Sequence, residues 1–446
     1  MTVPDSAGVD LLSPAIAQTG PTLWDSFGTM VQQREFDIVV YGATGYVGKL
    51  TAEYLSKAGG SAAIALAGRS VEKVRKVRET LGESARNWPI IEADAGDPAS
   101  LVAMAARTQV VITTVGPYTR YGLPLVAACV EAGTDYADLT GETPFIRASA
   151  DQFHHLAADA GTRIVHSCGF DSVPSDLTVY ALYDRAHADG AGELTTTNMV
   201  VRKFVGGASG GTLASILEAK RTMSGNPDIR RAMLDPYTLS PDRGAEPDLG
   251  RQSDTPLQRG VRIAPELHGS WTGAFIMAAE NSRIVRRSNA LLDWAYGRTF
   301  RYSEQISTGP SALAPIAAAA YTAVNAGLSG LGSRYANKLP VGLTERVMPK
   351  PGTGPSDEAL AKGHYRIETY TTTTTGARYW AVIAQQGDPS YTSTAVLLGE
   401  SGLALALERD RLSDLRGVLT PAAAMGDALL TRLPAAGVTF ETTRLN

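Results

Sequence analysis

The residues best suited to chemistry in this chain are three glycines spaced three positions apart. Gly42, Gly45 and Gly48 follow an apolar run directly and precede a helix-like segment, in the stretch I-V-V-Y-G-A-T-G-Y-V-G-K of residues 38–49. A glycine turn between strand and helix lets the backbone approach a pyrophosphate, whose charge the helix N-terminus stabilises. The pattern predicts a dinucleotide site. The expected contacting residues of this loop are Gly42, Ala43, Thr44, Gly45, Tyr46 and Val47.

The end of the next strand indicates which dinucleotide binds. Residues 65–70 read A-L-A-G-R-S, whereas an NAD site usually has Asp or Glu at this position to hold the ribose hydroxyls. Arg69 can stack on adenine and pair with a 2′-phosphate, and Ser70 is a second candidate contact. The sequence therefore favours NADP(H) over NAD(H). In the alternative interpretation, Arg69 is a solvated surface arginine.

Two further strand ends supply candidate cofactor contacts. Asp94 lies where the third strand ends, a position that often meets the adenine edge, while Asp97 precedes Pro98 and is predicted to cap a helix. Gly116 and Pro117 end the fourth strand and would let the backbone pass close to the nicotinamide ribose. The side chains that follow them are expected at the carboxyl edge of the sheet, where open α/β folds bind ligands.

Other common chemistries lack their characteristic residues. None of the 17 tyrosines has a lysine four residues later, the pair that short-chain dehydrogenases use. His154 and His155 are adjacent, whereas ligands on one helical face are three or four residues apart, so no metal site is predicted. The net charge of −4, from 41 basic and 45 acidic residues, gives no reason to expect nucleic acid as a partner.

Composition places the chain among soluble globular proteins of about two domains, with 446 residues and 44% hydrophobic content. The two cysteines, Cys129 and Cys168, are too few for a disulfide framework, so a reducing, cytoplasmic location is expected. Residues 1–33 are expected to be a poorly ordered leader. Residues 305–333 carry no charge and are expected to form a helix of small residues, with a peripheral lipid contact left open.

The elements that must position these residues alternate along the first half of the chain. Apolar runs followed by helical segments predict a doubly wound parallel sheet with right-handed crossovers, the Rossmann-type α/β fold. The predicted strands are Ile38–Tyr41, Ala62–Ala67, Trp88–Glu92, Val110–Val115, Tyr136–Asp138 and Arg163–Ser167.

After about residue 192 the pattern changes to that of a second α/β domain with a mainly antiparallel sheet. Glu193–Phe204 and Tyr365–Thr375 alternate like antiparallel strands, and the run Thr371–Thr375 is expected on a sheet face. The other expectations here are helices at Thr212–Met223, Asn289–Tyr296, Thr392–Leu407 and Pro421–Leu433, and a long loop or lid at Asn226–Arg262. The expected domains are 34–192 (nucleotide), 193–384 (substrate) and 385–446 (helices returning to the first domain).

Five ordered motifs together resemble a known superfamily. They are G-A-T-G-Y-V-G-K, A-G-R-S, V-G-P-Y-T-R-Y-G, D-Y-A-D-L-T-G-E and C-G-F-D-S-V-P-S-D-L. The chain resembles the saccharopine dehydrogenase-like oxidoreductases, and most closely their trans-acting enoyl reductase branch. The resemblance implies NADPH-dependent reduction of a carbon–carbon double bond in a lipid or polyketide intermediate. That chain would be carried on a polyketide synthase, in the synthesis of phthiocerol-type envelope lipids.

Two alternative functions remain open at this point. A saccharopine reductase-like amino-acid dehydrogenase would need basic groups for several carboxylates, and no convincing set is identifiable in the sequence. A lipid-surface protein that keeps the nucleotide fold but has little activity is the second alternative, favoured slightly by residues 305–333. Peripheral membrane contact and a homodimer are also left open.

Enoyl reduction needs a hydride, a proton, and a donor to the developing enolate oxygen. By position, Tyr118 and Tyr121 are the candidate donors, and Asp171 is expected to face the carboxyl edge of the sheet. Asp138 and Glu142 follow a strand end, and bonding to loop N–H groups explains them equally well. Cys168 is predicted to be a packed residue and His166 a core histidine.

Overall fold

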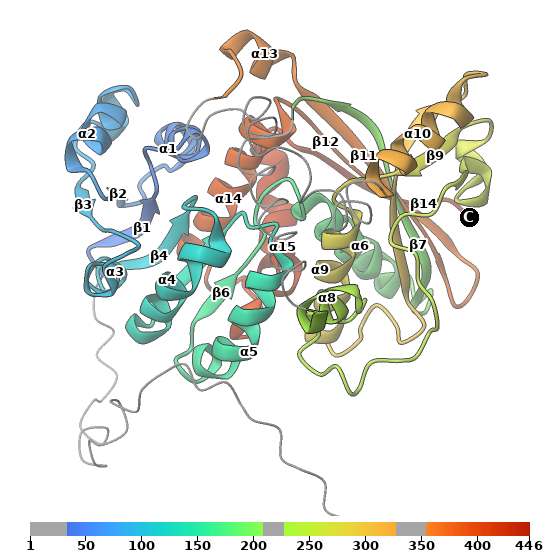
Figure 1. Ribbon diagram of the computed structural model, residues 1–446, viewed down its shortest axis with the longest axis horizontal. Coiled ribbons are helices and arrows are strands. Elements are labelled where there is room, and N and C mark those ends of the chain that lie inside the picture. Colours follow the sequence, from blue (N-terminus) through green and yellow to red (C-terminus); the bar gives the residue numbers. More distant parts are fainter. Residues whose placement is uncertain (1–33, 208–226, 327–353) are drawn as a thin grey trace, which may run out of the picture. The chain divides into compact units, whose positions relative to one another are not determined.

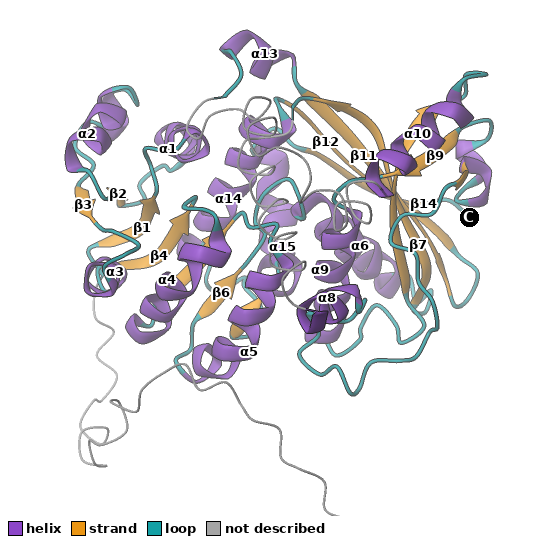
Figure 2. Ribbon diagram, in the orientation of Figure 1, coloured by secondary structure: helices purple, strands orange, loops and turns teal. Residues whose placement is uncertain are grey.

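Two β-sheets with helices between them organise the chain (Figures 1 and 2). This computed structural model describes residues 34–207, 227–326 and 354–446, and residues 35–446 form one compact unit. The predicted leader at residues 1–33 and the predicted helix at Thr212–Met223 lie outside the described residues.

The first sheet has seven strands, all parallel, in the order β13-β6-β5-β4-β1-β2-β3. Its strands are β1 (Phe36–Tyr41), β2 (Ile64–Gly68), β3 (Ile90–Glu92), β4 (Thr108–Thr113), β5 (Asp135–Asp138), β6 (Arg163–Val165) and β13 (Gly417–Leu419). The direction of winding reverses between β1 and β4, which is where such sheets bind ligands. This is the Rossmann-type sheet that the sequence predicts.

Helices cover both faces of the parallel sheet. The helices of this half are α1 (Tyr46–Ala58), α2 (Val71–Glu79), α3 (Pro98–Ala105), α4 (Tyr118–Ala132) and α5 (Thr143–Asp159), with a 3-10 turn at Glu83–Ala85. Because strand side chains alternate, Val39 and Val111 face α3, α4 and α5, whereas Val40 and Ile112 belong to the core on the opposite face.

The second sheet is mixed and has the order β14-β12-β11-β7-β10-β9-β8. Its strands are β7 (Leu194–Val205), β8 (Gln258–Arg259), β9 (Trp271–Ala274), β10 (Arg301–Gly309), β11 (His364–Thr373), β12 (Arg378–Gln386) and β14 (Thr439–Arg444). In the described chain only β7 and β10 pair in parallel, so the prediction of a mainly antiparallel second sheet is confirmed.

The remaining helices follow β6 of the parallel sheet in the chain, and α14 packs on β1, β4 and β5 of that sheet. They are α6 (Val173–Ala188), α8 (Pro227–Leu234), α9 (Ala278–Leu291), α10 (Ala314–Ala326), α13 (Asp357–Lys362), α14 (Thr394–Leu407) and α15 (Pro421–Ala435), with short turns at Gly260–Arg262, Pro265–Leu267 and Pro389–Ser393. Among the described residues, none of the helices has the length and apolar character that a membrane span requires.

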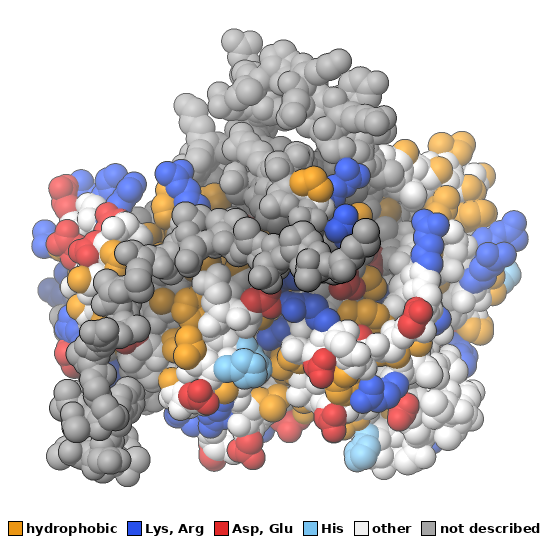
Figure 3. Space-filling model, turned by 60° about the horizontal axis from the view of Figure 1, so that its bottom comes forward, with side chains coloured by type: hydrophobic (Ala, Val, Ile, Leu, Met, Phe, Trp, Pro, Cys, Tyr) orange, Lys and Arg blue, Asp and Glu red, His pale blue; other side chains and the backbone are white. Residues whose placement is uncertain are grey.

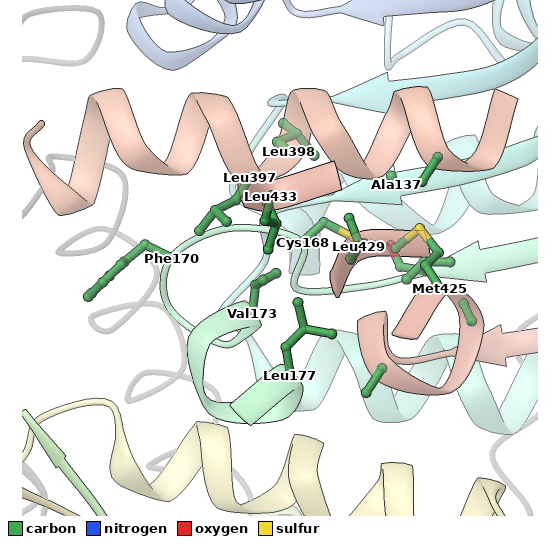
Figure 4. Packing of buried hydrophobic residues seen from close by; sticks show 14 of the residues in the cluster. Ala137, Cys168, Phe170, Val173, Leu177, Leu397, Leu398, Met425, Leu429 and Leu433 are labelled. Atoms are coloured by element: carbon green, nitrogen blue, oxygen red, sulfur yellow. Dashed lines mark hydrogen bonds between the residues drawn. The ribbon is translucent and has the colours of Figure 1, made fainter. Parts of the chain in front are cut away.

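A continuous apolar core connects the sheets through α6, α14 and α15. Figure 4 shows Leu177 of α6, Leu397 of α14 and Leu429 of α15 converging near Cys168. The C-terminal segment also supplies β13, which pairs in parallel with β6. The end of the chain therefore completes the nucleotide-binding sheet.

The threonine-rich strand β11 is buried rather than solvated. The hydroxyl oxygens of Thr197 and Thr371 are 2.6 Å apart, and those of Thr178 and Thr369 are 2.8 Å apart. Because the paired hydroxyl groups are buried, each pair supplies the hydrogen bond that water would otherwise make. Thr371 and Thr373 lie on one face of the sheet and the threonine between them on the other, because side chains alternate along a strand. The next two threonines form the turn to β12, so the prediction of a sheet face holds for only part of the run.

The segment Asn226–Arg262, predicted as a long loop or lid, contains α8 and is held by buried arginines of α9. Arg283 donates to the Met233 carbonyl at 2.8 Å and forms an ion pair with Asp254 at 3.2 Å, and Arg287 donates to the Leu239 carbonyl.

The prediction of a helix at Asn289–Tyr296 was wrong, because α9 begins at Ala278 and ends at Leu291.

Candidate functional site

The glycine turn packs strand, helix and neighbouring strand too closely for side chains. Gly42 has a φ of 91°, and a Cβ there would lie 2.7 Å from Val115 and 2.9 Å from the Thr114 hydroxyl. A Cβ on Gly48 would lie 2.2 Å from the Gly42 carbonyl oxygen. Both positions therefore require glycine. The Gly45 N–H donates to the Gly42 carbonyl at 2.9 Å and closes the turn.

The first turn of α1 offers its backbone N–H groups to an anion. No side chain caps the helix at Gly45, and its first turn contains no acidic residue. The first N–H groups of a helix have no partner within it, and the positive end of the helix dipole lies there. The turn therefore fits a pyrophosphate. Contacts from Ala43, Thr44 and Val47 stay predictions.

The side chain of Tyr46 is engaged elsewhere. Its hydroxyl donates to the Pro355 carbonyl at 2.7 Å, and its ring meets the Tyr391 ring edge-on, with centroids 5.0 Å apart. Only the backbone N–H of Tyr46 is left for a phosphate contact, and that contact stays a prediction. The tyrosine side chain ties the nucleotide loop to the segment that precedes α13.

At the end of β2, Arg69 is exposed and directly follows the strand next to β1. This position fits an arginine that reaches the adenosine 2′-phosphate. The Ser70 hydroxyl accepts from the Lys73 N–H at 3.4 Å and caps α2. Capping accounts for Ser70 without a cofactor, so its contact with NADP(H) stays a prediction.

The acidic residues after β3 serve the local backbone. Asp97 caps α3 as predicted, because its carboxylate accepts from the Ala99 N–H at 3.1 Å. Asp94 is exposed, and its carboxylate accepts from the Gly96 N–H at 2.9 Å. Contact between Asp94 and the adenine stays a prediction.

The two candidate tyrosines of α4 differ in their surroundings. The Tyr118 hydroxyl is buried and donates to the Thr113 carbonyl at 3.2 Å, while its ring stacks on Phe145. Burial raises the pKa of Tyr118 well above its usual value. Tyr121 is partly exposed and lies under the Arg120 guanidinium, and its hydroxyl has no hydrogen-bond partner among the described residues. It follows Gly116 and Pro117, which are joined by a cis peptide bond, by less than two helical turns.

The carboxylates of Asp138, the last residue of β5, and of Glu142 in the following loop accept from backbone N–H groups, one of the two roles that the sequence left open. Glu142 accepts from the N–H of Tyr118 at 2.9 Å and from the N–H of Thr119 at 2.7 Å, and so caps α4. Asp138 accepts from the N–H groups of Thr140 and Ser167, both at 3.0 Å. These two carboxylates therefore fix the backbone conformation of the loops at the carboxyl edge of the sheet.

A buried network lies beneath this edge. The His166 imidazole is 2.8 Å from the Asp138 carboxylate and 2.8 Å from the Ser149 hydroxyl, and all three residues are buried. His166 is thus a core histidine, as predicted. Cys168 is also buried and packs as predicted, and burial raises the pKa of its thiol well above the usual value, as in structural cysteines.

The charge of Asp171 acts on Glu280, an acid that no sequence motif singles out. A Cβ on Gly141 would lie 3.8 Å from the Asp171 carboxylate and 3.5 Å from the Met277 side chain, which directly precedes α9. Glu280 is in the first turn of α9. Burial raises the pKa of Asp171 to about 6 and that of Glu280 to about 8. Two carboxyl groups with raised pKa values therefore lie near the end of the parallel sheet, close enough for the charge of Asp171 to act on Glu280.

The fold and the glycine turn define a dinucleotide-binding oxidoreductase of the Rossmann type. Residues 38–165 match the family model described as the saccharopine dehydrogenase NADP binding domain. This match confirms NADP(H) as the expected cofactor. Arg69, in place of an acidic residue after β2, agrees with it.

Close relatives then show the family of the whole chain. It is 70% identical over 412 residues to a Mycobacterium tuberculosis (strain ATCC 25618 / H37Rv) protein provisionally named a trans-acting enoyl reductase, covering 92% of this chain and 98% of that protein. It is 63% identical over 415 residues to the trans-acting enoyl reductase of Mycobacterium bovis (strain BCG / Pasteur 1173P2), covering 93% and 99%. The chain belongs to the trans-acting enoyl reductase family.

A solved structure shares the fold across both sheets. Saccharopine dehydrogenase (L-Glu forming) from Saccharomyces cerevisiae, in its apo form, has a TM-score of 0.50 and 12% identity, covering 92% of this chain and 99% of that protein. At this identity the likeness concerns the fold alone. It confirms the fold of the saccharopine dehydrogenase-like superfamily.

Proposed function

We propose that this protein reduces the carbon–carbon double bond of an enoyl thioester with NADPH, acting on a chain carried by a polyketide synthase. The observation that carries the proposal is 63–70% identity, over nearly full length, to proteins named trans-acting enoyl reductases. The glycine turn and the titratable groups at the same edge of the sheet support it. Phthiocerol-type lipid synthesis is the proposed setting.

Bound NADPH supplies the hydride for the β-carbon of the enoyl group. The protein must place a hydrogen-bond donor at the thioester oxygen, where negative charge develops. We assign this role to the Tyr121 hydroxyl, because it is partly exposed and has no partner among the described residues. Tyr118 is the weaker candidate, since its hydroxyl is buried and already donates to Thr113.

The charges at this edge favour a thioester over a saccharopine-like substrate. Glu142, Asp171 and Glu280 are close enough to act on one another, since the first two raise the pKa of Glu280 through their negative charge. A substrate with several carboxylates would be repelled by such a cluster. A thioester carries no charge at its reacting end, so the cluster tolerates it.

A second candidate contact concerns the apolar surface around α10. Leu313, Ile316 and Val324 are more than 60% exposed, at 69%, 67% and 62%. We propose that this face contacts a membrane surface. On the face drawn in Figure 3, basic and acidic side chains of the described residues are interspersed, so nucleic acid is not proposed.

The test is NADPH oxidation by the purified protein with a long-chain 2-enoyl thioester, offered free and on an acyl carrier protein. Substrates of the saccharopine pathway are run in parallel. Oxidation with the thioester alone is expected. Turnover with the amino-acid substrates alone would contradict the proposal. Liposome flotation tests the lipid contact, and remaining in the bottom fraction would argue against it.

A further inference from the structure

The acid Glu280 combines a buried, unpartnered carboxyl oxygen with a place among other acids. Its Oε1 atom is buried and has no hydrogen-bond partner among the described residues, although the residue as a whole is partly exposed. An ionised carboxylate in that position would leave a desolvated charge unpaired, which is costly. The geometry therefore suits a protonated carboxyl group with one oxygen held away from water.

Charged and polar groups from several elements act on the pKa of Glu280. Burial is the main cause that raises its pKa, and the charges of Asp171 and Glu142 raise it further. The Thr143 hydroxyl at the start of α5 and Arg283, one turn along α9, lower it. Arg283 is itself paired with Asp254 at 3.2 Å, which weakens its influence.

The position of this acid links it to the candidate active site. Glu142, whose charge acts on Glu280, is hydrogen bonded to the N–H groups of Tyr118 and Thr119 in the first turn of α4. That same turn carries Tyr121. Glu142 thus connects Glu280 with the proposed oxygen donor: its charge acts on Glu280, and its carboxylate holds the helix turn that carries the donor.

We propose that the Glu280 carboxyl group delivers the proton to the α-carbon of the enoyl thioester, and that Asp171 keeps the proton on Glu280 until then. Glu280 is thus a catalytic acid and Asp171 a positioning residue. The inference rests on the proposed function, because it assigns the second half of the same reduction.

The step balances with NADPH as the reductant. As the β-carbon accepts the hydride, the electron pair of the double bond moves to the α-carbon and the thioester oxygen. The O–H bond of Glu280 then breaks, a carbon–hydrogen bond forms at the α-carbon, and the bonding electrons of the O–H remain on the carboxylate. Water returns the proton to Glu280. The double bond has been reduced and NADPH oxidised to NADP⁺.

Asp171 acts through its charge. Asp171, with the lower pKa of about 6, ionises first, while Glu280 is still neutral. Its negative charge then opposes the ionisation of Glu280. Removing the charge in Asp171→Asn should move the loss of the Glu280 proton to lower pH, whereas a merely structural role would leave that pH unchanged.

The experiment uses the full chain in three variants: Glu280→Gln, Asp171→Asn and Glu246→Gln. Glu246 is a matched control, because burial also raises its pKa but it lies in the loop held by Trp294. Titration of the carboxyl carbons by ¹³C NMR, on cofactor-free protein, follows Glu280 directly; its signal is the one missing in Glu280→Gln. NADP⁺ binding, measured by fluorescence, reports whether each variant folds.

We expect Glu280 to titrate above neutral pH in wild type and lower in Asp171→Asn. Glu280→Gln should bind NADP⁺ normally but reduce the enoyl thioester about 10²- to 10⁴-fold more slowly, the usual contribution of a general acid. Glu246→Gln should match wild type. Wild-type rates in Glu280→Gln, or a Glu280 signal titrating in the ordinary glutamate range, would overturn the inference alone. If the wild-type protein does not reduce the enoyl thioester at all, both the proposed function and the role of Glu280 as proton donor are overturned.

Discussion

At the scale of single residues, Arg69 is the side chain expected to select the cofactor. It is exposed at the end of β2, where an acid would repel a 2′-phosphate. Arg69→Met should weaken NADPH binding roughly 10- to 100-fold, because a hydrogen bond to a charged group contributes about 1.5–3 kcal/mol. NADH binding should hardly change. Isothermal titration of both cofactors measures this, with Arg75→Met on exposed α2 as control.

Equal losses for NADPH and NADH in Arg69→Met would contradict this role. Such a result would show that the arginine supports the fold or the adenine, and not the phosphate.

The two tyrosines of α4 should respond differently to loss of the hydroxyl. Tyr121→Phe should lower kcat about 10²- to 10³-fold, since removing one donor to an oxyanion typically has that effect. Tyr118→Phe should instead lower the free energy of unfolding by about 0.5–1.5 kcal/mol, because its hydroxyl donates to Thr113. Steady-state kinetics and urea unfolding of both variants separate the roles. The reverse pattern would make Tyr118 the donor.

The residues of the nucleotide site could be predicted from their types in the sequence, whereas the proposed catalytic acid could not. Gly42, Gly48 and Arg69 are recognisable because glycine and arginine meet needs that few other side chains can meet. Glu280 could not be found in this way. A glutamate in a polar stretch is usually exposed, and its importance arises from elements distant in sequence, the turns that hold Gly141 and Asp171.

At the scale of elements, the strand-turn-helix unit of β1 and α1 depends on close backbone approach. In Gly48→Ala the new Cβ would lie 2.2 Å from the Gly42 carbonyl oxygen, so strand and helix must separate. The variant should lose about 1–3 kcal/mol of stability, as overpacked sites do, together with NADP⁺ binding. Thermal unfolding and fluorescence titration measure the two effects.

Gly96→Ala is the matched control, because the nearest atom to its Cβ would be 3.5 Å away, in ordinary contact. It should keep both properties. A Gly48→Ala protein with wild-type stability and nucleotide affinity would contradict the close packing of this turn.

Elements were predictable where one physical pattern dominated. The parallel strands are short apolar runs buried on both faces, so β1, β2 and β4 stand out in the sequence. Helix α9 was missed because it is buried on all sides and most of its buried residues are polar. Asn281, Arg283 and Arg287 bind backbone carbonyls and side chains of other segments. Hydrophobic periodicity cannot reveal a helix of that kind.

At the scale of the whole molecule, buried acids tie stability to pH. Burial raises the pKa of Asp176 and of Glu304 to about 7, from usual values of 3.8 and 4.5. Between these limits the folded state binds more protons than the unfolded state, so the free energy of unfolding falls as pH rises. The contribution of these two groups to the free energy of unfolding should be greatest below about pH 4. It should decrease between about pH 4 and pH 7 and stay constant above about pH 7.

Each such group should contribute a slope of up to about 1.4 kcal/mol per pH unit in this window. Glu304→Gln should therefore flatten the dependence of stability on pH, whatever its effect at a single pH. Glu358→Gln, on the exposed surface of α13, should keep the wild-type slope. Urea unfolding at several pH values measures both, and an unchanged slope in Glu304→Gln would contradict a raised pKa for Glu304.

The central claim is that hydride passes from NADPH to the β-carbon of an enoyl thioester on this protein. The most direct measurement uses NADPH deuterated at either face of its nicotinamide ring, with a carrier-bound 2-enoyl chain, followed by mass spectrometry of the product. We predict one deuterium at the β-carbon from one of the two faces and a solvent proton at the α-carbon. An unreduced enoyl chain, with deuterium transferred to an amino-acid product instead, would contradict the account.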